Sequence, residues 1–258
     1  MNNISKISFI ITPKFFLLIL LIISFFFIFL DIPLYELTRQ FKGSIFSFFR
    51  NVIDPLSDVF DPLNIIILCL ILLSINLNIQ SILKNDLKLK TLKEKTKFSN
   101  KKILDSFSLI KLICQHFITS LALAGIICNL LKYIIGVSRP KYFFFHDYDR
   151  LNPFNMEHKV NSFPSGHTQA AFTLAVLIMI YTNRYTIIIL IMAILMALSR
   201  IFMSMHFPSD LIFGAYVGSF VPIVVFKLYF MDKIEKITSS NDIEISDLLR
   251  IMYYRVFI

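Results

Sequence analysis

The chain has 258 residues, of which 56% are hydrophobic and only 17% are charged, and its mean hydropathy is +0.71. Soluble domains are far less apolar, so the composition excludes an ordinary soluble protein and predicts one that lies in a bilayer. The formal net charge of +9 predicts no nucleic-acid partner, because basic loops that set membrane topology and attract anionic lipid account for it.

Six apolar stretches approach the roughly 20 residues that a helix needs to cross a bilayer. They are residues 15–30, 63–79, 107–135, 168–181, 185–203 and 211–230. The first could instead be a cleaved signal peptide, since Lys6 and Lys14 precede it, but it is long and no small-residue cleavage site follows it. We therefore expect a retained anchor and an all-α fold, in which six transmembrane helices form a single membrane domain over residues 1–258.

Charge differs between the loops that follow the first and the second span. Five acidic residues outnumber three basic ones in the first of these loops, namely Asp31, Glu36, Asp54, Asp58 and Asp61. The second loop, residues 81–106, holds eight lysines: Lys84, Lys88, Lys90, Lys93, Lys95, Lys97, Lys101 and Lys102. Basic residues near a span resist translocation, so this loop, both termini and the C-terminal tail 231–258 are predicted to be cytoplasmic.

Polar residues at the ends of apolar spans are costly and often functional, and three groups of them follow. The first is the segment KYIIGVSRP, which runs from Lys132 to Pro140. Two helical turns would put Lys132 and Arg139 on one face, about 10 Å apart along the axis. Pro140 disfavours helix at Arg139, so we expect the helix to end there. Taken alone, the pair is better explained by two cations that snorkel to the interface.

The second group is FPSGHT, residues 163–168, directly before the fourth span. Ser165 can cap the incoming helix, and Gly166 lets the backbone approach a ligand closely. The start of a helix has free N–H groups and a positive dipole end, so it can bind an anion. The alternative is a helix cap with His167 present by chance.

The third group runs from Ser199-Arg200 to His206 and Asp210, between the fifth and sixth spans. Pro208 suits a first helical turn, so Asp210 should lie near the start of the sixth span and within reach of His206. A carboxylate on one imidazole nitrogen leaves the other as a base or nucleophile. The alternative is an Arg–Asp pair that closes a membrane loop.

The predicted topology brings all three groups to the same, non-cytoplasmic side. Two arginines, a lysine and free helix-start amides can hold phosphate oxygens, while two histidines supply a nucleophile and a proton donor. The three cysteines have no metal-ligand spacing, and no carboxylate cluster that could hold magnesium accompanies the groups. Phosphoryl transfer without a metal or another cofactor is therefore the predicted chemistry.

These residues resemble the type 2 phosphatidic acid phosphatase superfamily, which also includes vanadium haloperoxidases and glucose-6-phosphatase. The signature of that superfamily is a lysine ahead of Arg-Pro, then Pro-Ser-Gly-His, then Ser-Arg followed by His and Asp. Every part is present between residues 132 and 210, in the residues Lys132, Arg139, Pro140, Pro164, Ser165, Gly166, His167, Ser199, Arg200, His206 and Asp210.

The resemblance implies a role for each matching residue. His206 attacks phosphorus, Asp210 orients and stabilises it, and His167 protonates the leaving oxygen and later activates water. The phosphate oxygens are bound by Lys132, Arg139, Arg200, Ser165 and the backbone N–H of Gly166. Vanadate, which mimics pentacoordinate phosphorus, should inhibit the enzyme.

The implied substrate is a lipid phosphate or pyrophosphate of the phosphatidic acid, phosphatidylglycerol phosphate, undecaprenyl pyrophosphate, sphingoid phosphate or lipid A type. The signature decides neither among these lipids, nor between water and another acceptor, nor the oligomeric state. A phosphotransferase therefore remains an alternative, as does a lipid transporter, although the charges gather at one face rather than near the midplane, where transporter sites lie. A non-catalytic scaffold is disfavoured because every reactive position is present. A bacterial inner membrane with a periplasmic site is the expected location, and the loop 141–162 is expected to select the head group.

Overall fold

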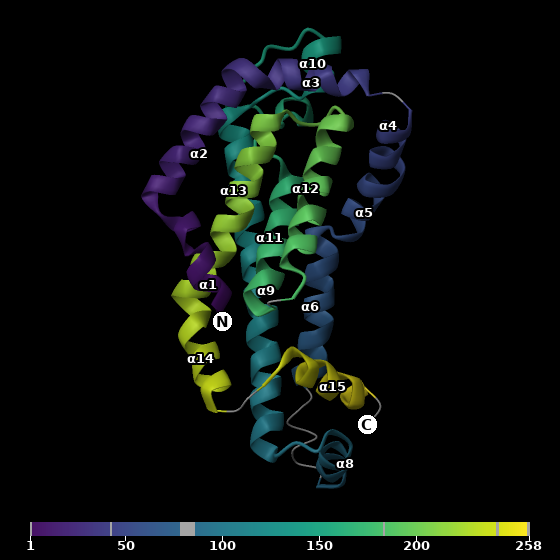
Figure 1. Cartoon of the computed structure of the whole chain (residues 1–258), viewed down its shortest axis with the longest axis vertical. Coiled ribbons are helices and arrows are strands. Elements are labelled where there is room, and N and C mark those ends of the chain that lie inside the picture. The colour runs from purple at the N-terminus through teal and green to yellow at the C-terminus, as the bar shows by residue number, and fades with distance from the viewer. Residues whose placement is uncertain (1, 42, 78–85, 183, 241–242, 257–258) are drawn as a thin grey trace. The chain divides into compact units, whose positions relative to one another are not determined.

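The computed structural model describes residues 2–41, 43–77, 86–182, 184–240 and 243–256, and most of these residues are helical. The only extended pairing within these ranges is an isolated antiparallel bridge between Val137 and Leu151. Figure 1 shows the helices in chain order. The all-α prediction is therefore confirmed for the part of the chain that the structure describes.

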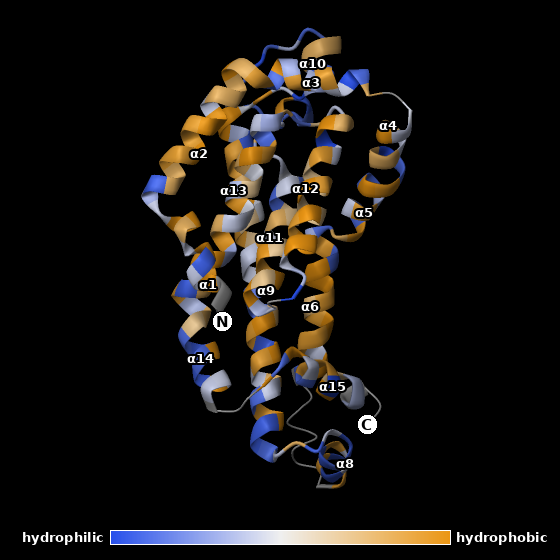
Figure 2. Ribbon diagram, viewed as in Figure 1, coloured by the Kyte–Doolittle hydropathy of each residue, from blue (hydrophilic) through white to orange (hydrophobic). Residues whose placement is uncertain are grey.

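Among the described residues, four runs of helix are long and apolar enough to cross a bilayer: Pro13–Gln40, Ser44–Asn76, Asn100–Ile135 and Pro208–Ser239. Two shorter apolar helices, Gly166–Tyr181 and Thr186–Phe202, coincide with the predicted fourth and fifth spans. In Figure 2, α6 (Pro62–Leu77) is mostly apolar, whereas α8 (Asp86–Thr96) is rich in hydrophilic residues. The chain is an integral membrane protein by these criteria, and the count of six spans stays a prediction.

Contacts divide the chain into two compact units: residues 1–64 with 120–224, and residues 65–119 with 225–258. Every residue of the signature region 132–210 belongs to the first unit. The prediction of a single membrane domain over the whole chain stays a prediction.

The second unit contains most of α6 and the first half of α9 (Asn100–Ile135), together with α8, η5 (Phe226–Phe230), α14 (Met231–Ser240) and α15 (Ile245–Val256). Its core is formed by Leu92, Ile103, Phe107 and Ile251, beside an ion pair of 2.7 Å between Lys102 and Asp247. The predicted cytoplasmic loop and tail are thus helical and pack together where they are described. Lys84 and the rest of 81–85, the end of the second span at 78–79, and tail residues 241–242 and 257–258 lie outside the described residues.

The first unit begins with α1 (Asn2–Ile7), η1 (Ser8–Ile11), α2 (Pro13–Phe25), η2 (Phe26–Leu30), α3 (Asp31–Gln40), α4 (Ser44–Phe48), η3 (Phe49–Ile53) and α5 (Asp54–Val59). It continues after α9 with α10 (Pro140–Phe145), η4 (His158–Val160), α11 (Gly166–Tyr181), α12 (Thr186–Phe202) and α13 (Pro208–Val225). Figure 1 shows α11, α12 and α13 side by side, with α3 lying across one end of α12 and α13. The loop after the first predicted span is therefore largely helical.

Small residues let α13 approach α11 closely. A Cβ added to Gly214 would lie 2.6 Å from Ser165 O, and one added to Gly218 would collide with Gln169 O. The two glycines are four residues apart and so share one helix face, the small-residue pattern that brings membrane helices together. This contact places the start of α11 against the first turns of α13, where two of the three signature groups lie.

Candidate active site

The helix α9 ends at Ile135, three residues after Lys132 and four before Arg139. The prediction that two helical turns separate the lysine from the arginine is therefore wrong. Gly136 is the cause, because its φ of +62° is left-handed backbone that ends the helix. A Cβ at this glycine would collide with the carbonyl oxygen of Asn152. The backbone N–H of Asn152 also donates a hydrogen bond to Gly136 O, at 2.7 Å. Arg139 then adopts extended backbone and precedes α10.

His206 lies in the loop between α12 and α13, and only 2% of it is exposed. Its Nδ1 lies 3.6 Å from Asp210 Oδ2 and 3.4 Å from Ser162 Oγ. Asp210 Oδ2 also accepts hydrogen bonds from Ser162 Oγ and from Phe207 N, the second at 2.7 Å. Pro208 begins α13, as the sequence predicts. Because Nδ1 faces the carboxylate, Nε2 is the nitrogen left to meet a substrate.

Burial, and then four nearby basic groups, hold the pKa of the His206 imidazole well below its usual value of 6.5. These groups are Arg139, Lys132, Arg200 and His167. The imidazole is therefore neutral near pH 7, which is the form that can act as a nucleophile. The same interactions show that the structure brings the predicted cations and both histidines into one region.

The start of α11 adds backbone donors to this region. Ser165 caps the helix as predicted, and its own N–H donates to Asp210 O at 3.0 Å. Gly166 N and His167 N stand in the first turn, where a helix offers no carbonyl partner. Lys132 Nζ is close, since it would lie 3.4 Å from a Cβ added to Gly166. An ammonium group beside a helix start is suited to an anion. The Ser165 side chain is fully buried, and its role in phosphate binding stays a prediction.

Both signature arginines are almost fully buried, with 5% of Arg139 and 6% of Arg200 exposed. Arg200 Nη1 pairs with Asp54 Oδ1 at 2.5 Å. The Nε of each arginine is buried and has no hydrogen-bond partner within the described residues. Buried donors normally have partners, so both guanidinium groups retain capacity to bind a further anion.

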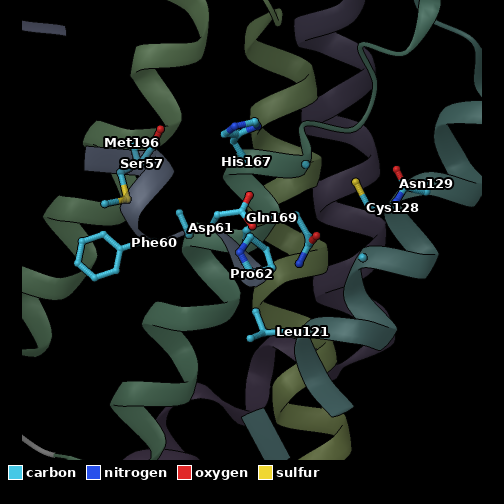
Figure 3. Close-up of a pocket in the computed structure, with 14 residues that line it drawn as sticks. Ser57, Phe60, Asp61, Pro62, Leu121, Cys128, Asn129, His167, Gln169 and Met196 are labelled. Atoms are coloured by element: carbon cyan, nitrogen blue, oxygen red, sulfur yellow. The ribbon is translucent and has the colours of Figure 1, made fainter. Parts of the chain in front are cut away.

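A cavity of about 280 Å³ adjoins His167 (Figure 3). The imidazole is exposed to it from the first turn of α11. The walls carry both polar and apolar side chains, among them Ser57, Asp61, Asn129, Gln169, Phe60, Leu121 and Met196. The cavity therefore suits a group that is itself partly polar.

No three His, Cys, Asp or Glu side chains gather in a group that could hold a metal ion in the ranges that the structure describes. Metal-independent chemistry remains a prediction, which chelation tests.

Four residues without a predicted part in the chemistry lie beside the site: Asp54 and Asp31, and also Ser162 and Arg150 of the loop 141–162. Ser162 bridges His206 and Asp210, and Asp54 pairs with Arg200. Asp31 pairs with Arg150 through Nη2, and Nη1 of this arginine has no hydrogen-bond partner within the described residues. Selection of the head group by the loop 141–162 stays a prediction. The sequence signal that could have identified them is the rule that a charge beside an apolar stretch has a partner or a function. From the sequence, Asp31 and Asp54 served only to predict which side of the membrane their loop faces.

Residues 115–234 match the family model of the PAP2 superfamily. This part of the chain is similar to the PAP2 superfamily. The match contains the whole signature region 132–210, so the resemblance that the sequence motifs carry is confirmed.

Three curated relatives align with parts of the chain. Lipid A 1-phosphatase from Rhizobium etli is 30% identical over 119 residues, which are 45% of this chain and 50% of that protein. Lipid A 1-phosphatase from Rhizobium johnstonii is 31% identical over 109 residues, 42% of this chain and 44% of that protein. Bacitracin transport permease protein BcrC from Bacillus licheniformis is 30% identical over 105 residues, which are 40% of this chain and 51% of that protein. The chain spans about half the length of these relatives, and no solved structure matches it.

Proposed function

We propose that this chain is a metal-independent phosphatase, which hydrolyses a lipid phosphate or lipid pyrophosphate through a phosphohistidine intermediate on His206. The environment of His206 carries the proposal. A buried, neutral imidazole has its Nδ1 beside Asp210 and Ser162, while basic groups surround it. The PAP2 superfamily and the lipid A 1-phosphatases among the relatives support a phosphatase that acts on lipid.

In the first step, Nε2 of His206 attacks phosphorus, so that a P–N bond forms and the bond from phosphorus to the leaving oxygen breaks. Burial and then Arg200 lower the pKa of His167 to about 4, and the negative charge of a bound phosphate raises that pKa again. His167 enters this step as the imidazolium and gives its proton to that oxygen. The phosphorylated imidazole of His206 carries positive charge, which the Asp210 carboxylate stabilises.

In the second step, His167, now neutral, removes a proton from water as the water oxygen attacks phosphorus. The P–N bond breaks, its electron pair returns to Nε2 of His206, and inorganic phosphate leaves. His167 is again protonated, so the cycle is balanced.

Charge on the transferring phosphoryl group is held by Lys132, Arg139 and Arg200, with Ser165 and the N–H of Gly166 as further donors. The Nε atoms of both arginines, which have no partner among the residues that the structure describes, support this assignment. Because these cations neutralise the phosphate, the reaction needs no metal ion.

The cavity beside His167 is where the leaving group of the substrate would lie. Its mixed lining suits the segment of a lipid between the phosphate and the acyl chains. We infer that the site opens at the non-cytoplasmic ends of the helices, in a bacterial inner membrane with both termini in the cytoplasm.

Incubation with ³²P-labelled lipid phosphate, followed by an alkaline quench that preserves phosphohistidine, tests the mechanism. His206→Ala should give neither phosphate release nor labelled protein. His167→Ala should slow phosphate release by about 10²- to 10⁴-fold and regain part of the first step with an aryl phosphate, whose leaving group needs little protonation. Lys90→Ala changes an exposed residue of α8 in the second unit and serves as the control. Label on His206→Ala but none on His167→Ala would reverse the two roles.

A second candidate is a transporter, which the name of the Bacillus licheniformis relative, a bacitracin transport permease protein, favours. Release of inorganic phosphate from purified protein separates the two functions, since a transporter moves its substrate unchanged. A phosphotransferase would consume the lipid phosphate but pass the phosphoryl group to an alcohol acceptor.

A further inference from the structure

The helix α3 contacts both ends of the loop that carries His206. Figure 1 shows it lying across the ends of α12 and α13. Its side chains Asp31 and Arg39 reach α13 and α12 respectively. Neither residue belongs to the PAP2 signature described above, and the mechanism gives neither a chemical role.

At α13, Asp31 binds the first turn of the helix. It is completely buried, and it accepts bonds from Ser209 N at 2.8 Å and from Ser209 Oγ at 2.6 Å. Asp31 also pairs with Arg150, whose guanidinium carbon lies 3.6 Å from the centre of the Phe207 ring. Phe207 N in turn donates to Asp210. Asp31 and Arg150 therefore hold the residues on both sides of Pro208.

At α12, Arg39 binds the last turn of the helix. Its Nη2 donates to Ile201 O at 2.9 Å and to Phe202 O at 2.8 Å, and its Nη1 donates to Ser204 Oγ at 2.9 Å. Ile201 O also accepts a hydrogen bond from Ser204 N at 3.0 Å, so Arg39 adds a further donor there and supplies one to Phe202 O, among the final carbonyls that a helix cannot pair internally. These carbonyls directly follow Arg200.

We propose that α3 is a positioning clamp for the His206 loop, acting through Asp31 at α13 and Arg39 at α12. The two residues are eight positions apart, about 12 Å along a helix, so one rigid element sets the spacing between the two helix ends. That spacing determines how His206 and Asp210 face Arg200 and the phosphate. The loop backbone has its own bond to α12, from His206 N to Arg200 O at 3.3 Å. The clamp rests on the proposed function, because its effect is on the attack by His206.

Asp31→Asn tests the α13 end. The amide keeps an oxygen for Ser209 but removes the charge that pairs with Arg150. We expect kcat and the rate of ³²P labelling of His206 to fall by up to about 10²-fold, the usual effect of a 1 Å misplacement, with KM nearly unchanged. Glu36→Gln makes the same chemical change at an exposed position of α3 and should leave kcat unaltered.

The double variant Asp31→Asn/Arg150→Gln distinguishes positioning from general damage. The single change leaves a buried guanidinium without its partner, and removing both charges relieves that state. The fold decrease in kcat of the double variant should therefore be smaller than the product of the fold decreases of the two single variants. Independent effects that simply multiply would contradict a clamp built on this pair.

Arg39→Gln tests the α12 end, with exposed Arg50→Gln as its control. Lysine can bind a carbonyl but lacks the fork that spans two, so Arg39→Lys should recover only part of kcat. Wild-type kcat in both Asp31→Asn and Arg39→Gln would overturn the clamp.

If Asp31→Asn does not fold, Ser209→Ala removes one of the two bonds to Asp31 and keeps the ion pair, and an unchanged kcat there would also overturn the clamp. Absence of phosphate release by the wild type would instead contradict the proposed function.

Discussion

Gly214 offers a sharp test of how closely α11 and α13 must pack. It stands one helical turn after Asp210, and an added Cβ would lie 2.6 Å from Ser165 O and 3.3 Å from Thr168 Cβ. Real Cβ atoms do not approach a backbone oxygen so closely. Gly214→Ala must therefore move the two helices apart by roughly half an ångström, at the contact that joins Ser165 to Asp210.

Two effects of the methyl group oppose each other. Alanine is a better helix former than glycine by about 1 kcal/mol, whereas overpacking costs about 1–3 kcal/mol. Overpacking should win, because the nearest atom is backbone oxygen and cannot rotate away. We expect net destabilisation of up to about 2 kcal/mol. Since a displacement of 1 Å can cost about 10²-fold in rate, half that displacement should lower kcat by roughly 10-fold.

The assay compares the thermal unfolding midpoint and the initial rate of phosphate release for purified protein in detergent. Gly125→Ala is the control for stability, because it adds the same methyl group within α9 where no atom lies within 4 Å. That variant should be as stable as the wild type or more so. A Gly214→Ala protein with wild-type stability and wild-type kcat would refute the close packing of α11 on α13.

Three further predictions follow from the cations, the loop charges and the His206 environment. Phosphate release should survive EDTA and be inhibited by vanadate, and full loss on chelation that magnesium restores would contradict a metal-free site. A tag inserted near Asn155 should be accessible to external protease in intact cells while a C-terminal tag is protected, and the reverse pattern would overturn the topology. Burial and then Arg139 lower the pKa of His206, and the neutral form attacks, so the acid limb of kcat/KM due to His206 should lie below pH 6.5. Arg139→Gln removes a cation and should shift that limb to higher pH, and an unmoved limb would show that Arg139 does not act on this imidazole.

Features that depend on neighbouring residues were predictable from the sequence. Ser165 caps α11 and Pro208 opens α13, because capping and the first turn follow from residues within one helical turn. The four-residue spacing then brings Asp210 to His206. The alternation of the six predicted spans likewise puts the three signature groups on one side of the bilayer, which stays a prediction.

The path of the chain between Lys132 and Arg139 was not predictable by the same reasoning. Pro140 was the obvious helix breaker, yet Gly136 ends α9 earlier. Many membrane helices tolerate a glycine in their interior, so the presence of Gly136 does not by itself predict that the helix ends there. What requires glycine at this position is the collision that any side chain would have with Asn152. Asn152 belongs to the loop that returns after α10.

The partners of the buried charges come from segments distant in the sequence, which explains why spacing could not reveal them. Arg200 pairs with Asp54 across 146 positions, and Arg150 pairs with Asp31 across 119. A buried charge without a partner is strongly unfavourable, so each of these arginines requires a carboxylate from elsewhere in the fold. Arg139 forms no ion pair with a described residue, and it is buried beside His206. A bound phosphate would therefore balance its charge directly, and removal of Arg139 should weaken substrate binding with less disturbance to the fold than removal of Arg200, which would leave Asp54 without its partner.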